Sequence, residues 1–254
     1  AVIGDLARVH PVIQHADAKE HGTRDKAVGD HLDDAALDAD LVEIVVLSLE
    51  ISLSAVFIAT LVALPLGATV AVFRFPGRGA CIVLLNALMG LPPVAVGLLI
   101  YLLLSRAGPL GEYGLLYTPA AMVIAQAVLV VPIIAALAQQ VLSELYGEYE
   151  EQLRSLGVSS ARAIPTLLWD GRFSLLIAVL AGFGRASAEV GAVIIVGGNI
   201  NHLTRVMTTT IALETSKGNL AMALGMGLIL VLIVIFVNAL TVVVRSGASR
   251  LQGR

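Results

Sequence analysis

The chain has 254 residues, of which 57% are hydrophobic and 14% are charged, and its mean hydropathy is +0.90. Because soluble domains carry about 25% charged residues, this composition excludes an ordinary soluble domain and predicts a protein embedded in membrane lipid. The net charge of −3 gives no support for nucleic-acid binding. The single cysteine, Cys81, excludes an internal disulfide and a cysteine-based zinc site, so we expect a small core residue there.

Residues 1–40 differ from the rest of the chain. They are rich in Asp and His and contain no long apolar run, which predicts a polar, solvated tail. The cationic start and apolar region of a secretory signal are missing. The spacing of the histidines matches no familiar ligand pattern, so we predict no metal site among His10, His15, His21 and His31.

Five segments are apolar over the length of about 20 residues that a membrane-spanning helix needs. They cover about residues 44–73, 80–104, 119–142, 173–196 and 220–244. Prolines and glycines inside them are tolerated because neighbouring helices satisfy the freed backbone groups. The predicted fold class is all-α: a polytopic membrane helix bundle of about five transmembrane helices over residues 41–246, with a short tail at 247–254.

The distribution of basic residues predicts the orientation of the spans. If the polar loop 144–172 is cytoplasmic, most arginines outside the spans lie on that side: Arg74, Arg78, Arg154, Arg162, Arg172, Arg245, Arg250 and Arg254. The short loops on the other side hold Arg106, Arg205 and Lys217. The positive-inside rule then predicts a multi-pass protein of the cell membrane, with its N-terminus outside and its C-terminus in the cytoplasm.

The polar loop has the pattern of two short helices joined at a glycine. Residues 148–155 are good helix formers, and Gly157 can end a helix in the left-handed conformation. Ser159 or Ser160 can cap a second helix at about residues 161–169. A solvated loop and a docking surface both fit this pattern.

A resemblance to a known family begins in this loop. The order Glu151, Arg154, Leu156, Gly157, Val158, Ser159 resembles the cytoplasmic "EAA" loop of binding-protein-dependent ABC transporter permeases. The stretch "MGLPPVAVGLLIYLLLSRAGPLG" (89–111) resembles the second span of oxyanion permeases. Residues 182–219 resemble the tungstate branch, because related molybdate and sulfate permeases usually lack its threonine-rich "TRVMTT" stretch.

The resemblance implies a type I ABC importer permease that forms a homodimer around a central pathway. Two cytoplasmic ATPase subunits would grip the EAA loops, and an extracytoplasmic substrate-binding protein would deliver an oxyanion. Tungstate is the favoured substrate, with molybdate or sulfate as the alternative. ATP and Mg²⁺ would bind the partner ATPase, because this chain has no GxxxxGK[ST] phosphate loop; we therefore expect no bound cofactor, and a transport subunit rather than an enzyme.

Arg185 and Glu189 are ionisable residues deep in the fourth apolar segment. Their spacing of four residues places them on one helix face, and an unpaired charge at this depth costs about 2.5–3.5 kcal/mol. We therefore expect them to pair. Two interpretations stay open: a buried ion pair that fixes helix packing, or a transient anion contact in a pathway that includes Ser187.

A polar segment follows on the predicted outer side. It contains Asn199, Thr204, Arg205, Thr208 and Thr209. Hydroxyls and an arginine can donate hydrogen bonds to a dianion without enclosing it, which predicts an outer vestibule or a docking surface for the binding protein. An ordinary capped turn is the alternative.

Two other classes of protein remain as alternatives. A self-sufficient secondary transporter or channel would be favoured by inverted repeats, and none is visible in the sequence. A membrane enzyme would need clustered reactive side chains at membrane depth, whereas Arg185 and Glu189 are the deep ionisable pair.

Overall fold

The computed structural model describes residues 40–252. Contacts divide the chain into two units, Ala1–Ile44 and Val45–Arg254, and the second unit carries the architecture discussed below. The predicted polar tail lies outside the described residues except for Asp40.

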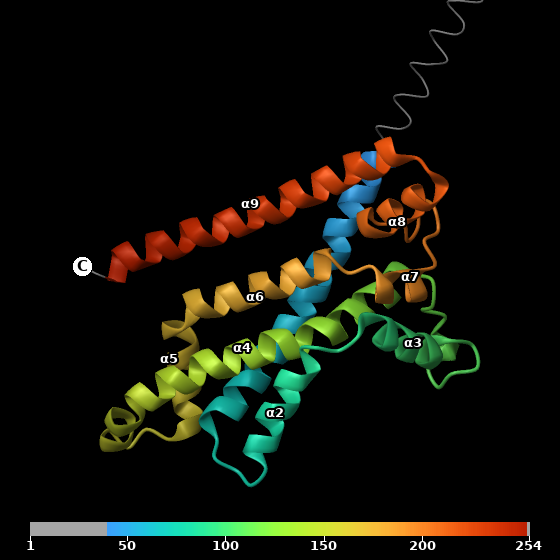
Figure 1. Ribbon diagram of the computed structural model, residues 1–254. Helices are drawn as coiled ribbons and strands as arrows, with labels where there is room; N and C mark the ends of the chain where they lie inside the picture. Colours follow the sequence, from blue (N-terminus) through green and yellow to red (C-terminus); the bar gives the residue numbers. More distant parts are fainter. Residues whose placement is uncertain (1–39, 253–254) are drawn as a thin grey trace, which may run out of the picture. The chain divides into compact units, whose positions relative to one another are not determined.

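Every regular element among the described residues is a helix, which confirms the predicted all-α class (Figure 1). A first helix, Asp40–Val72, opens the described chain. It is followed by α2 (Arg78–Leu88), α3 (Pro93–Leu104), the short 3₁₀ helix η1 (Gly111–Tyr113), α4 (Pro119–Ser155), α5 (Ser160–Asp170), α6 (Arg172–Ser187), α7 (Gly191–Gly197), α8 (Met207–Lys217) and α9 (Leu220–Gln252). The backbone of the predicted C-terminal tail is helical as far as Gln252.

Among the described residues, three helices are long and apolar enough to cross a membrane: the first helix, α4 and the Leu220–Leu240 part of α9. Two sharply bent helix pairs raise the number of candidate spans to five if each pair counts as one span. Helix α4 begins where the sequence dictates, because Pro119 occupies its first turn and the Thr118 hydroxyl accepts a hydrogen bond from the Ala121 N–H.

The second predicted span consists of two helices joined at a sharp bend. Helices α2 and α3 meet at 99° across the Gly90–Leu91–Pro92 segment. Pro92 is extended and Pro93 opens α3, so neither proline lies inside a helix.

The fourth predicted span is also interrupted, whereas we expected one continuous helix. Helix α6 ends at Ser187, and α7 begins at Gly191. The side chain of Glu189, between them, accepts a hydrogen bond from the N–H of Ala192 in the first turn of α7. This carboxylate therefore caps a new helix where the sequence pattern predicts a continuing one.

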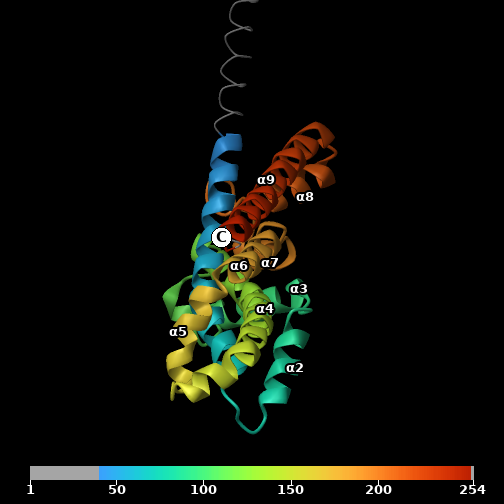
Figure 2. The ribbon, with the colours of Figure 1, turned by 90° about the vertical axis from the view of Figure 1, so that its left-hand side faces the viewer.

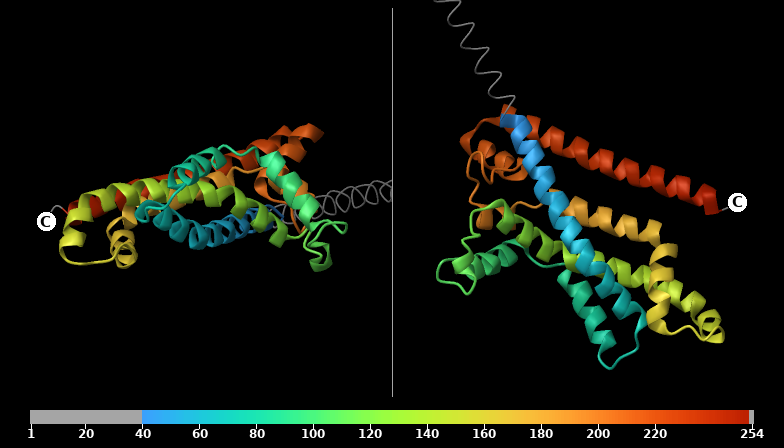
Figure 3. Two further views of the ribbon diagram at one scale, coloured as in Figure 1. Left: turned by 90° about the horizontal axis from the view of Figure 1, so that it is seen from below. Right: turned by 180° about the vertical axis from the view of Figure 1, so that it is seen from behind.

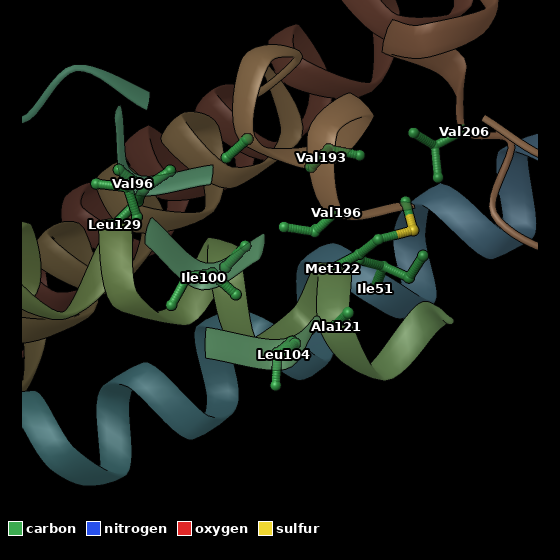
Figure 4. Packing of buried hydrophobic residues seen from close by; sticks show 12 residues of the cluster. Ile51, Val96, Ile100, Leu104, Ala121, Met122, Leu129, Val193, Val196 and Val206 are labelled. Atoms are coloured by element: carbon green, nitrogen blue, oxygen red, sulfur yellow. The ribbon is translucent and has the colours of Figure 1, made fainter. Parts of the chain in front are cut away.

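Close packing joins the second and fourth predicted spans to α4. Buried apolar residues of the first helix, α3, α4 and α7 form one cluster that includes Ile51, Ile100, Met122 and Val193 (Figure 4). A Cβ atom on Gly97 would lie 2.7 Å from the Ala192 Cα, so this glycine permits α3 and α7 to touch.

The first helix crosses α4 and α6 on one side (Figure 3). Its Ala59 and Ala63 are fully buried against a cluster that includes Ile134 of α4 and Phe183 of α6. Gly182 fits between the Val130 and Ile134 side chains of α4, because a Cβ there would lie within 2.9 Å of both. This small residue of α6 thus allows α4 and α6 to pack closely.

Helix α9 follows α8 and packs against α8 and α6 (Figure 2). Only 11% of its apolar window is buried, against 61% for α4. Helix α4 is therefore the most enclosed of the three long candidate spans, and it is the helix that leads into the polar loop.

Candidate functional site

The polar loop forms a helical hairpin, which we define as residues 148–170. We expected a separate short helix before the glycine, but α4 continues without a break from Pro119 to Ser155. Gly147 lies within this helix and does not interrupt it. The first arm of the hairpin is therefore a direct extension of an enclosed span.

The turn of the hairpin follows the sequence prediction. Gly157 has φ +66°, and the N–H of Val158 donates to the Leu153 carbonyl at 2.9 Å. This is the left-handed helix ending that glycine favours. Ser159 occupies the position before α5, although its side chain makes no capping hydrogen bond there.

The predicted coupling residues gather at the tip of the hairpin. Glu151, Arg154, Leu156, Gly157 and Ser159 are exposed, and Val158 is half-buried. Leu156 is 77% exposed, which is a high value for a large apolar side chain beside a charged surface. An exposed leucine within a ring of polar groups has the chemistry of a protein-docking surface.

The base of the hairpin is rigidly attached to the spans. Leu167 of α5 is 1% exposed and packs with Leu142 of α4 and Val72 of the first helix. The Tyr149 hydroxyl donates a 2.6 Å hydrogen bond to Asp170 Oδ2, which ties the two arms together. The two arms are therefore joined to each other and to the first helix at the base of the hairpin.

Arg74 connects the hairpin to the end of the first helix, and Arg78 connects that helix to α4 just before the hairpin; neither role is predicted from the sequence. Arg74 donates to both carboxylate oxygens of Glu150 at 3.0 and 2.8 Å. Arg78 donates to the Val70 carbonyl at 2.7 Å and to Ser143 Oγ at 3.2 Å. Arg74 and Glu150, like Arg78 and Ser143, are far apart in sequence, so spacing carries no signal for these pairs.

At the opposite end of α6, the predicted ion pair forms. Arg185 Nη2 lies 3.4 Å from Glu189 Oε2, and the Glu189 side chain is 3% exposed. The other Glu189 oxygen caps α7, and the Thr208 hydroxyl donates to the Glu189 carbonyl at 2.9 Å. Glu189 thus joins α6, α7 and α8, which favours the structural interpretation of this pair over an anion contact.

Ser187 lies beside this junction. Its hydroxyl oxygen is buried and has no hydrogen-bond partner among the described residues. The amide of Gln126 in α4 donates from Nε2 to the Ala186 carbonyl at 3.1 Å and so holds the end of α6. The junction therefore places several polar groups inside an otherwise apolar layer.

The threonines of the predicted vestibule are buried and hydrogen-bonded within the chain. Thr204 Oγ1 donates to the Gly197 carbonyl at 2.6 Å, and Thr209 Oγ1 donates to the Val206 carbonyl at 3.0 Å. Together with Thr208, these hydroxyls are not free to bind a dianion in this conformation. They hold the segment between α7 and α8 in place instead.

Asn199 and Arg205 belong to the same segment. Asn199 has a left-handed backbone at φ +51°. Arg205 donates from Nη1 to Asn201 Oδ1 at 2.9 Å. Both are half-buried, so the vestibule role stays a prediction for these two residues.

The end of α8 carries a local ion pair. Glu214 accepts hydrogen bonds from Lys217 Nζ at 2.9 Å and from Asn219 Nδ2 at 3.0 Å. The hydrogen bond from Lys217 lowers the pKa of Glu214 below its ordinary value. The pair stabilises the turn into α9.

Fold and site together define a multi-pass helical membrane protein with a rigid exposed hairpin at the end of an enclosed span. No family model matches the chain. A probable anion ABC transporter permease of Haloferax volcanii is 35% identical over 219 residues, which are 84% of this chain and 94% of the relative. A tungstate uptake system permease, TupB, of Peptoclostridium acidaminophilum is 40% identical over 205 residues, which are 81% and 90% of the two chains.

A sulfate transport permease, CysT, of Salmonella typhimurium is more distant, at 36% identity over 150 residues, which are 55% of this chain and 53% of the relative. The extent and identity of the first two matches place the chain plainly: it belongs to the permease proteins of ABC transporters. A protein of this family is the membrane subunit of its transporter and not the ATPase.

Proposed function

We propose that the chain is the permease subunit of an ATP-driven importer that carries an oxyanion, with tungstate as the favoured substrate. The observation that carries the proposal is the hairpin, whose exposed tip continues an enclosed span. The TupB relative named above supports tungstate. Another tungstate permease, from Campylobacter jejuni, is 38% identical over 149 residues.

In the proposed mechanism, the hairpin acts as a lever. Helix α4 has 37 residues and rises about 1.5 Å per residue, so it is about 55 Å long. It packs against α2, α3, α6 and α7, and its far end is continuous with the hairpin tip. When a partner ATPase moves the tip, the displacement reaches these helices through one uninterrupted element.

The proposal assigns partners to each end of the molecule. Two ATPase subunits, which bind ATP and Mg²⁺, would grip the hairpins of a permease homodimer. A substrate-binding protein would dock at the other end, near Asn199 and Arg205. The hairpin and the C-terminus would then lie in the cytoplasm and the N-terminus outside, as the arginine distribution predicts.

The substrate pathway would lie between two copies of the chain. Within one copy, Arg185 is paired with Glu189, so the arginine's charge is largely compensated. A conducting route must also bind its ion weakly enough to release it. We therefore assign Arg185 and Glu189 to the architecture of the pathway wall and leave discrimination between oxyanions to the binding protein.

Reconstituted transport tests this proposal. The permease would be placed in proteoliposomes with its ATPase and binding protein, and uptake of labelled tungstate, molybdate and sulfate would be compared with and without ATP. We expect ATP-dependent uptake, with tungstate preferred. A preference for molybdate or sulfate would show that tungstate is not the favoured substrate. Uptake without ATP or without the ATPase would contradict the assignment to an ATP-driven importer.

A further inference from the structure

A small cavity lies where the first helix, α4, the end of α6, α8 and α9 meet. Polar and apolar side chains both line it: Ser48, Leu49, Ile51, Ser52, Gln126, Ala186, Ser187, Val206, Met207, Thr208, Leu230 and Ile233. The space open to the centre of a water-sized molecule is about 10 Å³. A single water molecule needs roughly this volume, whereas a tetrahedral oxyanion needs far more.

Two buried oxygen atoms of the lining residues lack a partner among the described residues. They are Oε1 of Gln126 and Oγ of Ser187. Gln126 is 4% exposed, and its amide nitrogen is already engaged with the Ala186 carbonyl. Leaving such groups unsatisfied in an apolar layer is unfavourable, so a ligand that hydrogen-bonds to both is strongly favoured.

The remaining lining residues define the chemistry of that ligand. Ser48 Oγ accepts from the Met207 N–H at 2.8 Å, and Thr208 Oγ1 donates to the Glu189 carbonyl. Ser52 adds a further hydroxyl to the wall. The lining contains no charged side chain, so the site suits a small neutral molecule that both donates and accepts hydrogen bonds.

We propose that this cavity binds one structural water molecule, which donates to Gln126 Oε1 and shares a hydrogen bond with Ser187 Oγ. The water completes the polar junction at which α6 ends, because Gln126 also holds the Ala186 carbonyl. The interruption between α6 and α7 is then stabilised on two sides, by the Glu189 carboxylate and by the hydrated Gln126–Ser187 pair. This site does not depend on the substrate of the transporter.

Radiolytic labelling of methionines tests the proposal directly. An X-ray pulse produces hydroxyl radicals from ordered water, and these radicals oxidise adjacent side chains before they diffuse away. Met207 lines the cavity and is 3% exposed. Met122 and Met226 are as deeply buried, at 0% and 1%, and do not line it. In the complete transporter in lipid nanodiscs, we expect several-fold faster oxidation of Met207, measured by mass spectrometry.

Two variants sharpen the test. Ser187→Val removes one hydrogen-bond partner and fills the space, so Met207 oxidation should fall to the rate of Met122. Ser174→Val is the matched control on the same helix; it is exposed and outside the cavity, and should leave Met207 oxidation unchanged.

Equal oxidation of all three methionines in the wild-type protein would overturn the proposal, even if Ser187→Val fails to fold. So would a Met207 oxidation rate that Ser187→Val leaves unchanged.

Discussion

The hairpin and the α6–α7 junction are both polar regions of a largely hydrophobic chain, yet their polar groups have opposite roles. At the hairpin, Glu151, Arg154 and Ser159 are exposed around a protruding Leu156. At the junction, Glu189 and Thr208 are buried and bonded within the chain. Exposure therefore separates the polar groups that are available to a partner from those that maintain the fold, and residue type alone does not.

The largest expected effect comes from the turn of the hairpin. Gly157→Pro cannot adopt φ +66°, so the turn between the arms should be lost. We expect ATP-driven uptake to fall by roughly tenfold or more while the spans stay folded, because positioning errors of this kind are costly. Uptake and thermal unfolding of the purified permease measure the two effects separately.

Gly157→Asn provides the matched control, because asparagine tolerates the left-handed conformation and no atom lies within 4 Å of the added Cβ position. It should retain most of the uptake. Full uptake by Gly157→Pro would contradict the assignment of this turn to coupling.

The junction should respond in stability rather than in coupling. Glu189→Ala removes the cap of α7, which costs about 1 kcal/mol, and leaves Arg185, whose side chain is 35% exposed, without its carboxylate partner. We expect a lower yield and a lower Tm of the assembled permease. A stable Glu189→Ala permease that has lost only transport would show that Arg185 and Glu189 act in the substrate pathway and not in maintaining the fold.

A smaller effect is expected at the attachment of the hairpin. Arg74 is 77% exposed, so its pair with Glu150 contributes about 0–1 kcal/mol to stability. Arg74→Gln should therefore leave the Tm almost unchanged but loosen the hairpin and reduce the uptake per ATP hydrolysed. A double-mutant cycle with Glu150→Gln measures the coupling energy between Arg74 and Glu150. Additive effects of the two substitutions on uptake would show that the residues do not act as a pair.

The smallest effect concerns pH. Because Lys217 lowers the pKa of Glu214, this carboxylate stabilises the fold above its unfolded-state pKa, and that contribution is lost as the pH falls through the lowered folded-state value. Lys217→Met should flatten this acid-side dependence of the Tm. If the Tm of Lys217→Met fell with pH as it does in the wild-type protein, the Glu214–Lys217 pair would be excluded as the source of this dependence.

Much of this organisation could be predicted from the sequence, because local signals determine it. The glycine turn at Gly157 and the Arg185–Glu189 pair follow from spacing within a few residues, and the apolar runs predict the long helices. Hydropathy cannot show that α6 ends at Ser187, because the interruption depends on a carboxylate that caps the next helix. Arg74 and Glu150 meet only in the folded chain.

The threonines of the predicted vestibule illustrate a second limit. Their hydroxyls suit an anion site, but the fold uses them to hold backbone carbonyls, as Thr204 does with Gly197. A sequence lists donors without showing which are already engaged. Asn199 and Arg205 therefore remain the better candidates for contact with a partner on that side.

The central claim, that the hairpin tip is the contact with the ATPase, is tested most directly by crosslinking. A cysteine at Leu156, in a permease whose Cys81 is replaced by alanine, would be combined with the partner ATPase in membrane vesicles. Leu228→Cys, 62% exposed on α9, serves as the control. We predict a nucleotide-dependent crosslink to the ATPase from position 156 and none from position 228. No crosslink from position 156, or labelling of that position only by an impermeant thiol reagent added outside intact cells, would contradict the account.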